Sequence, residues 1–491
     1  MSAALRRAAL LLPLALGACA STLPPGITAP DAGFRLVADR TQATTGRRSV
    51  WLQSASQAQQ VAEEVHALTH QRMISADTAV QVALLNNRGL QASYAEIGLS
   101  AAEVWQQATP ENPVVALGVL GIGAPEVGAF RAIESLVAVN LLDAPTRRRR
   151  VAVAQAEFQR AQMQAVVDTL SLAHATRTAW IDAVAAFETV ALLSRAAQAA
   201  DASSELALEL GRTGALNRAA QAREQVFDAE LAAQTAEARL AAAAAKENLT
   251  RLMGLWGSEV DYYVPDALPA LPGGLRSTSG IEATALRNRV DLAVARLGLA
   301  ATARAYGLTD ATRTLTDLEV ISGVELEREP VDEGDGEIEQ GLTPQVEVEF
   351  AIPIFDSGRA RLRTAELTYL QAANVLAEAA VAVRSEARDA ETQYRGSYEI
   401  ARQYRDVVLP LRRIIDEESL LANNGMITST FELLIDIREG LGSQLDAAEA
   451  KQRFWLAAAG LDAAIYGGAG GAAAGEGGAG VDLAGEGGAG H

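Results

Sequence analysis

Carboxylates spaced two residues apart are the groups of this chain best placed to act on ions. Glu325 and Glu327 lie in one run of alternating polar and apolar residues, and Glu347 and Glu349 lie in another. A period of two places alternate side chains on one face of a β-strand. Rows of carboxylates attract cations and repel anions. Each run therefore predicts a strand whose acidic face selects ions, and the alternative is an acidic face that is merely solvated.

The histidines give weaker evidence of chemistry. His66 and His70 lie four residues apart in "HALTH", a spacing that suits a metal pair on a helix. No third ligand is evident, so incidental polar positions are favoured and no metal is predicted. No serine, cysteine or phosphate-loop constellation stands out either. The sequence predicts no enzyme and no cofactor.

The amino terminus has the features of an exported protein. Arg6 and Arg7 precede the apolar stretch Ala8–Leu16, which is too short to span a bilayer. It leads into "LGAC", which resembles the lipobox of bacterial lipoproteins and makes Cys19 the lipidated first residue of the mature chain. The residues "AS" that follow favour the outer membrane. The alternative is an ordinary signal peptide with an incidental cysteine.

Composition excludes several classes of protein. The formal net charge is −19, which argues against a nucleic-acid partner, because phosphate binding needs a basic surface. Cys19 is the only cysteine, so no disulfide can form within the chain. No run of 18 apolar residues follows the leader, so no transmembrane helix is predicted.

The chain reads as two halves with the same order of parts: a helix, two β-like runs, a long helix and a further helix. In the first half these lie at about 76–108, 113–123, 131–142, 146–211 and 216–253. In the second half they lie at about 280–306, 318–329, 344–355, 359–423 and 429–465. The predicted domains are a signal peptide (1–18), an anchored segment (19–75), a first repeat (76–264), a linker (265–279), a second repeat (280–466) and a disordered Gly/Ala-rich tail (467–491).

The junctions between strand and long helix also match. "LLDAPTRRRR" at 141–150 corresponds to "IFDSGRARLR" at 354–363. Asp143 and Asp356 suit the first turn or the cap of a helix. The arginines after them form a solvated face, or they contact lipid headgroups or a neighbouring subunit. Pro410, within the second long helix, should kink or break it.

The β-like runs have the length of membrane-crossing strands. A tilted strand of about ten residues crosses a bilayer. Four strands cannot close on themselves, and lipid does not tolerate open sheet edges. Pairing between several copies would remove those edges, with lipid outside and water inside. The alternative is a soluble sheet with one wet face.

Together these features resemble the TolC-like outer membrane factor family over about residues 70–466. The most specific parts are "PIFDSGRARLR", "NNGMITSTFELLIDIRE" and "LTRLMGL". In the first half, Ala144-Pro145 replaces the glycine usual after Asp143. The resemblance implies a mainly α fold with a membrane β-barrel. Long helical hairpins would form a periplasmic α-barrel, and each protomer would give four strands to a trimeric twelve-stranded barrel.

The resemblance also implies a role and a set of site residues. The role is that of an outer-membrane exit duct for efflux, served by a periplasmic adaptor and an inner-membrane pump. It places an acidic entrance constriction at Glu432 and Asp436, which are four residues apart and share a helical face. The hairpin tips that would contact the adaptor contain Gly214, Leu216, Gly425 and Met426. The stretch "NGMITSTFELLIDIRE" is similar to members associated with heavy-metal resistance, notably copper. The competing class is a structural lipoprotein, a helical spacer that conducts nothing.

Overall fold

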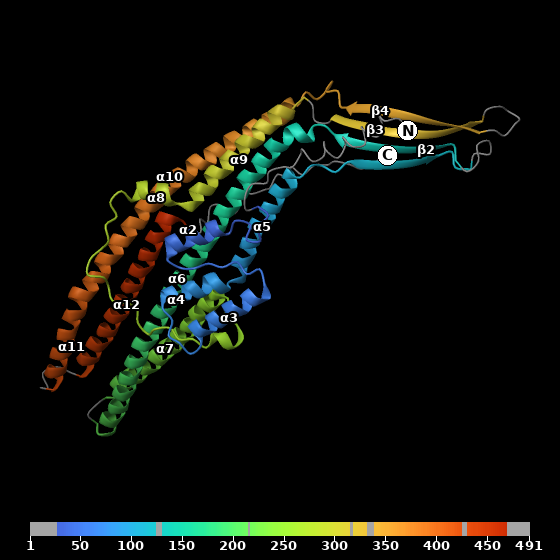
Figure 1. Cartoon of the computed structure of the whole chain (residues 1–491). Coiled ribbons are helices and arrows are strands. Elements are labelled where there is room, and N and C mark those ends of the chain that lie inside the picture. Colours follow the sequence, from blue (N-terminus) through green and yellow to red (C-terminus); the bar gives the residue numbers. More distant parts are fainter. Residues whose placement is uncertain are drawn as a thin grey trace. The chain divides into compact units, whose positions relative to one another are not determined.

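The computed structural model describes residues 27–123, 130–214, 217–314, 318–330, 338–424 and 430–468. The chain divides into two compact units, and Figure 1 labels the helices and strands that they contain. The first consists of Met1–Ala58, Arg88–Val167 and Arg289–Ser385. The second consists of Gln59–Asn87, Asp168–Asn288 and Glu386–His491. Each unit therefore combines segments from both halves of the sequence.

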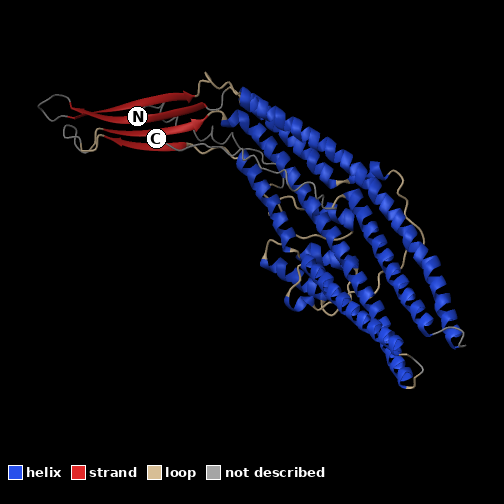
Figure 2. Ribbon diagram, turned by 180° about the vertical axis from the view of Figure 1, so that it is seen from behind, coloured by secondary structure: helices blue, strands red, loops and turns tan. Residues whose placement is uncertain are grey.

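The first unit contains a four-stranded antiparallel sheet (Figure 2). Its strands, in the order β1-β2-β3-β4, are β1 (Val114–Leu120), β2 (Ala132–Asn140), β3 (Leu318–Pro330) and β4 (Ile338–Phe350). The two halves of the sequence meet where β2 pairs with β3. At that point the backbone N–H of Leu141 donates to the carbonyl of Leu318 at 2.8 Å. All four predicted runs are strands, but the fourth begins six residues earlier and ends five residues earlier than predicted.

Helices attach to the sheet at one end. The first unit contains α2 (Arg35–Thr45), α5 (Arg88–Ala108), α9 (Val290–Thr312) and the first turns of α6 (Asp143–Arg212) and α10 (Arg359–Gln403). Helix α2 was not predicted. The segment before it is anchored by aromatic contact, because Phe34 lies 4.6 Å from Tyr94, ring centre to ring centre, in an edge-on arrangement. The side-chain amide of Gln162 donates to the carbonyl of Gly33 at 3.0 Å.

The second unit is helical. It contains most of α3 (Ala55–Thr69), α4 (Ala76–Asn86), α7 (Arg218–Met253), α8 (Ile281–Asn288), α11 (Leu409–Asn424) and α12 (Thr430–Tyr466), with the later parts of α6 and α10. Its helices pack through small side chains, as their alanine content predicts. One core cluster joins Leu193, Ala200 and Leu231. Alanine allows helix axes to approach closely.

The helix before each pair of strands is broken, where the sequence predicted a continuous helix. Asn87 separates α4 from α5 with φ −65° and ψ 119°, and Arg289 separates α8 from α9 with φ −64° and ψ 122°. Both residues have extended backbone. The side chain of Asn87 donates to the carbonyl of Leu252 at 2.9 Å, so a tertiary contact replaces the continued helix. The prediction of continuous helices at 76–108 and 280–306 is therefore wrong. The two breaks lie at equivalent places in the two halves of the sequence.

The predicted break near Pro410 is confirmed. Helix α10 ends at Gln403, and a π-helical turn, Tyr404–Val408, precedes α11. The N–H of Leu409 donates to the carbonyl of Tyr404, five residues earlier. Proline has no N–H to donate and clashes with the carbonyl four residues earlier. A wider turn just before it removes that conflict.

The stretch "LTRLMGL" ends the first half with a glycine cap. Gly254 follows α7 with φ 68°, a left-handed conformation that glycine adopts without strain. A Cβ there would lie 3.0 Å from the carbonyl oxygen of Asn86. The side chain of Asn86 donates in turn to the carbonyl of Gly254 at 2.7 Å. The glycine is thus required by backbone conformation and by close packing.

Among the helices that the structure describes, none combines the length and the apolar character needed to span a bilayer.

Candidate functional site

The strand register places the predicted acidic residues on one face of the sheet. Glu319 of β3 lies opposite Glu349 of β4, and Ile321 lies opposite Glu347. Residues directly opposed in an antiparallel pair project to the same side, and alternate residues of one strand share that side. The face therefore also includes Glu325 and Glu327 of β3 and Glu134 of β2.

The opposite face of the sheet is apolar and open. It presents Val115, Leu117, Val119, Ile133, Val137, Val139, Val320, Val324, Leu326, Leu342, Val346, Val348 and Phe350. Leu117 is 76% exposed and Val346 is 74% exposed. Exposed apolar side chains on a contiguous surface indicate a binding or membrane-facing area. The two faces of this sheet thus differ sharply in polarity.

A polar contact crosses the acidic face. The side-chain amide of Gln345 on β4 donates to a carboxylate oxygen of Glu134 on β2 at 2.7 Å. The strand between them carries Gly323, which lies opposite Gln345. A Cβ at Gly323 would come within 2.3 Å of the carbonyl of Ser135. The glycine keeps β2 and β3 close and leaves room for the side chains that bridge over β3.

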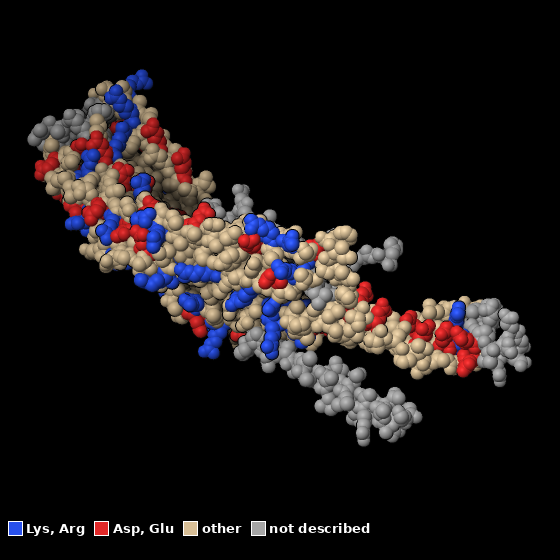
Figure 3. Space-filling view, turned by 90° about the horizontal axis from the view of Figure 1, so that it is seen from above, with Lys and Arg blue, Asp and Glu red and all other residues tan. Residues whose placement is uncertain are grey.

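Carboxylates dominate the sheet on the side drawn in Figure 3, where red side chains gather over the strands. The sheet has two edges, since β1 and β4 each pair with one neighbour within the described chain. An unpaired edge offers N–H and C=O groups to another strand. Both edges of the sheet therefore offer backbone groups to a further strand.

The predicted entrance acids lie at the start of α12. The side chain of Glu432 lies outside those that the structure describes. Asp436 accepts a hydrogen bond from the Ser419 hydroxyl of α11. A third carboxylate, Asp416, belongs to the same neighbourhood, and the prediction missed it. Burial raises the pKa of Asp416; the charge of Arg412 opposes this, and the charge of Asp436 adds to it.

Residues near Asp416 connect the two helices of this hairpin. The guanidinium of Arg412 on α11 lies 2.9 Å from a carboxylate oxygen of Glu439 and donates to the Ser443 hydroxyl at 3.1 Å. One carboxylate oxygen of Asp416 is buried and accepts no hydrogen bond in the structure. An uncompensated buried charge is unfavourable. The hairpin therefore holds a partly buried carboxylate, Asp416, beside the predicted constriction.

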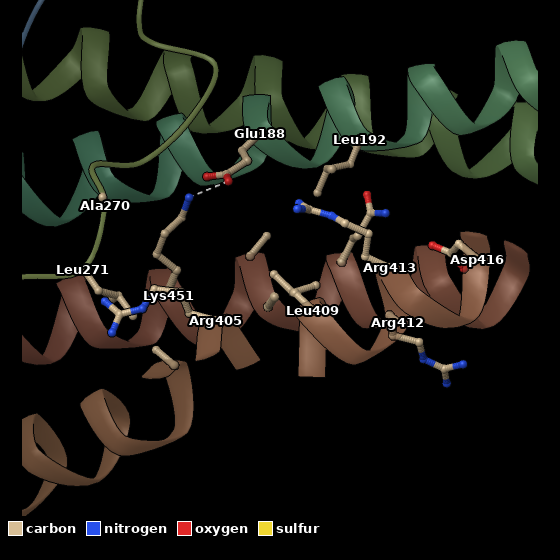
Figure 4. A pocket seen from close by; sticks show the side chains of 14 residues that line it. Glu188, Leu192, Ala270, Leu271, Arg405, Leu409, Arg412, Arg413, Asp416 and Lys451 are labelled. Carbon is tan, nitrogen blue, oxygen red and sulfur yellow. Dashed lines mark hydrogen bonds and ion pairs between the residues drawn. The ribbon is translucent and has the colours of Figure 1, made fainter. Parts of the chain in front are cut away.

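A cavity of about 540 Å³ lies in the second unit, lined by α6, α11, α12 and the segment at Ala270 and Leu271. Figure 4 shows Lys451 of α12 reaching across it to Glu188 of α6. Their charged atoms lie 2.6 Å apart. The Lys451 ammonium also donates to the carbonyl of Leu268 at 3.3 Å. This contact joins the last helix of the second half, the linker and the long helix of the first half.

The structure describes some of the remaining residues singled out in the sequence, namely one hairpin-tip residue and the two histidines. Gly214 has φ 77°, as a tight turn after α6 requires. Leu216, Gly425, Met426 and Cys19 lie outside the described residues. His66 and His70 stack with ring centres 4.5 Å apart. Within the described part of the chain, no group of three metal-binding side chains accompanies them.

The two junction aspartates differ. Asp143 is buried and ion-paired with both Arg147 and Arg150. Burial alone would raise the pKa of Asp143, but hydrogen bonds and charge from the two arginines outweigh it and lower the pKa. Asp356 instead accepts the backbone N–H of Gly358 at 2.8 Å. Part of the arginine-rich stretch is therefore structural in the first half.

Comparison with known proteins was made by sequence and by structure. No family model and no curated protein matches the chain. Among solved structures the chain is similar to CusC, whose structures concern transmembrane channel formation. The TM-score is 0.63 at 17% identity, covering 80% of this chain and 92% of that one. It is also similar to the outer membrane channel CmeC of Campylobacter jejuni, with TM-score 0.62 at 17% identity, covering 80% and 86%. The open-state MtrE outer membrane channel of Neisseria gonorrhoeae gives TM-score 0.59 at 17% identity, covering 79% and 88%.

At this identity the likeness concerns the fold. The chain therefore has the fold of outer-membrane channels, and the predicted resemblance to outer membrane factors is confirmed at that level. The predicted fold of long helical hairpins with four strands per chain is confirmed with it.

Proposed function

We propose that this protein is the outer-membrane exit duct of an efflux system. The observation that supports it best is the two-faced sheet. One face is apolar and exposed, and the other carries rows of carboxylates across β2, β3 and β4. A lipid-facing surface and a water-filled lumen require these two faces. We assign no catalytic step to it.

The open edges of the sheet support assembly with further copies. Three chains of four strands would form a twelve-stranded barrel wide enough for a water-filled pore. In this arrangement the long helices would form a tunnel in the periplasm. Chemical crosslinking in mild detergent should trap a trimer. A monomeric mass with no larger crosslinked species would contradict the assembly.

The helical hairpins would receive the other components of the system. In the proposed arrangement the tips around Gly214, Leu216, Gly425 and Met426 contact a periplasmic adaptor, behind which an inner-membrane pump supplies the substrate. Cys19 would hold the mature amino terminus in the outer membrane by its lipid. Glu432 and Asp436 would narrow the entrance.

The most specific part of the proposal is the class of substrate. The likeness of "NGMITSTFELLIDIRE" to members associated with metal resistance favours heavy-metal ions such as copper, and drugs are the second candidate. Cells lacking this protein should accumulate more copper than wild type under copper stress. A deletion strain that retains drugs but not copper would favour the second candidate.

Reconstitution in a planar bilayer tests the central proposal. The purified protein should produce discrete conductance steps that favour cations. A helical spacer that is only anchored by lipid would leave the bilayer closed, and it has no use for four membrane-length strands. A protein that inserts and conducts nothing would establish that competing function.

A further inference from the structure

Five exposed arginines lie near the end of the sheet where the helices attach. We call them the junction arginines: Arg148, Arg149, Arg313, Arg359 and Arg361. The first two follow β2 within α6, Arg313 precedes β3, and the last two follow β4 within α10. The chain as a whole carries a formal charge of −19, so this gathering of positive charge runs against its overall balance.

Backbone contacts bring these segments together. The end of β2 and the start of β3 are joined between Leu141 and Leu318, and Leu318 pairs with Phe350 at the end of β4. The guanidinium of Arg361 donates to the carbonyl of Arg313 at 3.2 Å. A Cβ at Gly358 would lie 2.3 Å from that same carbonyl. The arginines from both halves therefore share one region of the first unit.

Most of the junction arginines carry uncompensated charge. Within the part of the chain that the structure describes, Arg148, Arg149, Arg359 and Arg361 form no ion pair, and Arg313 is 3.9 Å from Asp310. Two acids near the start of α6 are already engaged, because Asp143 and Glu111 pair with Arg147 and Arg150. The junction arginines are thus available to an external anion.

An exposed apolar surface adjoins the arginines. Ile352 is 67% exposed and Ile354 is 74% exposed, and Phe355 is fully exposed. They continue the apolar series that begins in β4 and end four residues before Arg359. Apolar side chains next to cationic ones match the boundary between acyl chains and anionic headgroups.

We propose that the junction arginines bind the phosphate groups of anionic phospholipids in the membrane leaflet at the helical end of the sheet. Arginine suits this ligand because its planar fork donates two hydrogen bonds to one phosphate. The inference rests on the proposed membrane insertion of the sheet. It adds to that function a class of lipid and the membrane leaflet in which this lipid is bound.

The test compares the melting temperature of the full-length protein in two kinds of nanodisc, one of phosphatidylcholine and one containing phosphatidylglycerol as well. Wild type should melt higher in the anionic nanodiscs, and added salt should reduce the gain because it screens exposed charges. Replacement of all five junction arginines by glutamine should abolish the gain. The matched control removes the same charge in the second unit through Arg72→Gln, Arg218→Gln, Arg239→Gln, Arg251→Gln and Arg287→Gln, and it should keep the gain.

Several outcomes would overturn the inference. One is an equal melting temperature of wild type in both lipids, and another is a gain that the junction variant retains. Equal stabilisation by millimolar inorganic phosphate would indicate a general anion site. Loss of crosslinked trimer in the junction variant would indicate a subunit contact instead. Conductance of the same proteins in planar bilayers separates the two proposals. A conducting protein without lipid preference would contradict the lipid surface alone, whereas a non-conducting protein would contradict the duct.

Discussion

The Lys451 ammonium lies 2.6 Å from a carboxylate oxygen of Glu188. The two residues are 263 positions apart in the sequence, so their contact connects α12 with α6. Both side chains are largely shielded, with 21% and 14% of their surface exposed. Lysine occurs only twice in the chain, against forty arginines. The ammonium also donates to the carbonyl of Leu268, so it contacts two acceptors, as a point charge on a flexible stem can do.

Lys451→Met should destabilise the protein, because it leaves the Glu188 carboxylate shielded and without its cation. We expect a loss of about 2 to 4 kcal/mol, near the range for removing one partner of a buried pair. Thermal melting followed by helical circular dichroism measures it. The double variant Glu188→Leu with Lys451→Met removes both charges and should recover most of the loss. A single variant as stable as wild type would show that the pair contributes nothing.

Asp182 provides a prediction about pH. Its carboxylate on α6 accepts a hydrogen bond from the Gln452 amide at 2.8 Å. Burial raises the pKa of the Asp182 carboxyl above its ordinary value, and the hydrogen bond from Gln452 opposes the shift. The folded state therefore favours the protonated carboxyl. This stabilisation is fully present below the unfolded pKa and is lost as pH rises through the folded pKa.

Asp182→Asn should consequently raise the melting temperature at neutral pH, and the advantage should shrink as the pH falls toward 4. The amide keeps an acceptor for Gln452 and has no charge to bury. Asp266→Asn, at an exposed position of the linker, serves as the control and should change little at any pH. A stabilisation of the Asp182 variant that is equal at all pH values would argue against a titration effect.

The faces of the sheet could be predicted from the sequence because strand alternation is local. Val346, Val348 and Phe350 alternate with Glu347 and Glu349, and a pleated strand must separate them. The pairing across the sheet then follows from two hairpins and one contact between the halves. The long helical stretches on either side of Gly214 were predicted for the same reason, since caps and glycine turns are local signals.

The helix breaks at Asn87 and Arg289 and the charged contacts between helices could not be predicted in this way. Nothing in the local sequence forces Asn87 or Arg289 out of a helix, because both have ordinary propensity. The break at Asn87 depends on the carbonyl of Leu252. The raised pKa of Asp416 depends on burial within the hairpin, to which the charge of Asp436 adds. Contacts between distant segments decide these features. The rarity of lysine is the feature of the sequence that could have indicated Lys451 as a candidate.

Lipid attachment is a separate prediction. Cys19→Ala should abolish labelling of the protein by radioactive palmitate, because Cys19 is the only cysteine at which the predicted lipid can be attached. The variant should retain partial export activity, since the proposed strands anchor the protein by themselves. Cys19→Ala protein labelled to the same extent as wild type would disprove the lipobox interpretation.

The acidic face should set the ion selectivity of the proposed pore. In a trimer, Glu347 and Glu349 would each appear three times around the lumen, where walls of low dielectric strengthen their field. Glu347→Gln with Glu349→Gln should therefore reduce cation selectivity, measured as the reversal potential under a salt gradient. Glu237→Gln with Glu378→Gln removes the same charge from exposed helical positions and should leave the reversal potential unchanged. An anion-selective or unselective wild-type pore would contradict a role for the acidic face.

The entrance acids should determine block by multivalent cations. Asp436 lies close enough to Asp416 for its charge to raise the pKa of that carboxyl, so negative charge is already concentrated on this hairpin. A trivalent cation on the periplasmic side would bind where three copies of Glu432 and Asp436 converge, because a high charge gains most from such a ring. Glu432→Gln with Asp436→Asn should weaken this block and alter the conductance, whereas the lumen variant should retain the block. Trivalent block that is unchanged after both entrance substitutions would place the constriction elsewhere, and Asp416→Asn would then be the next variant to measure.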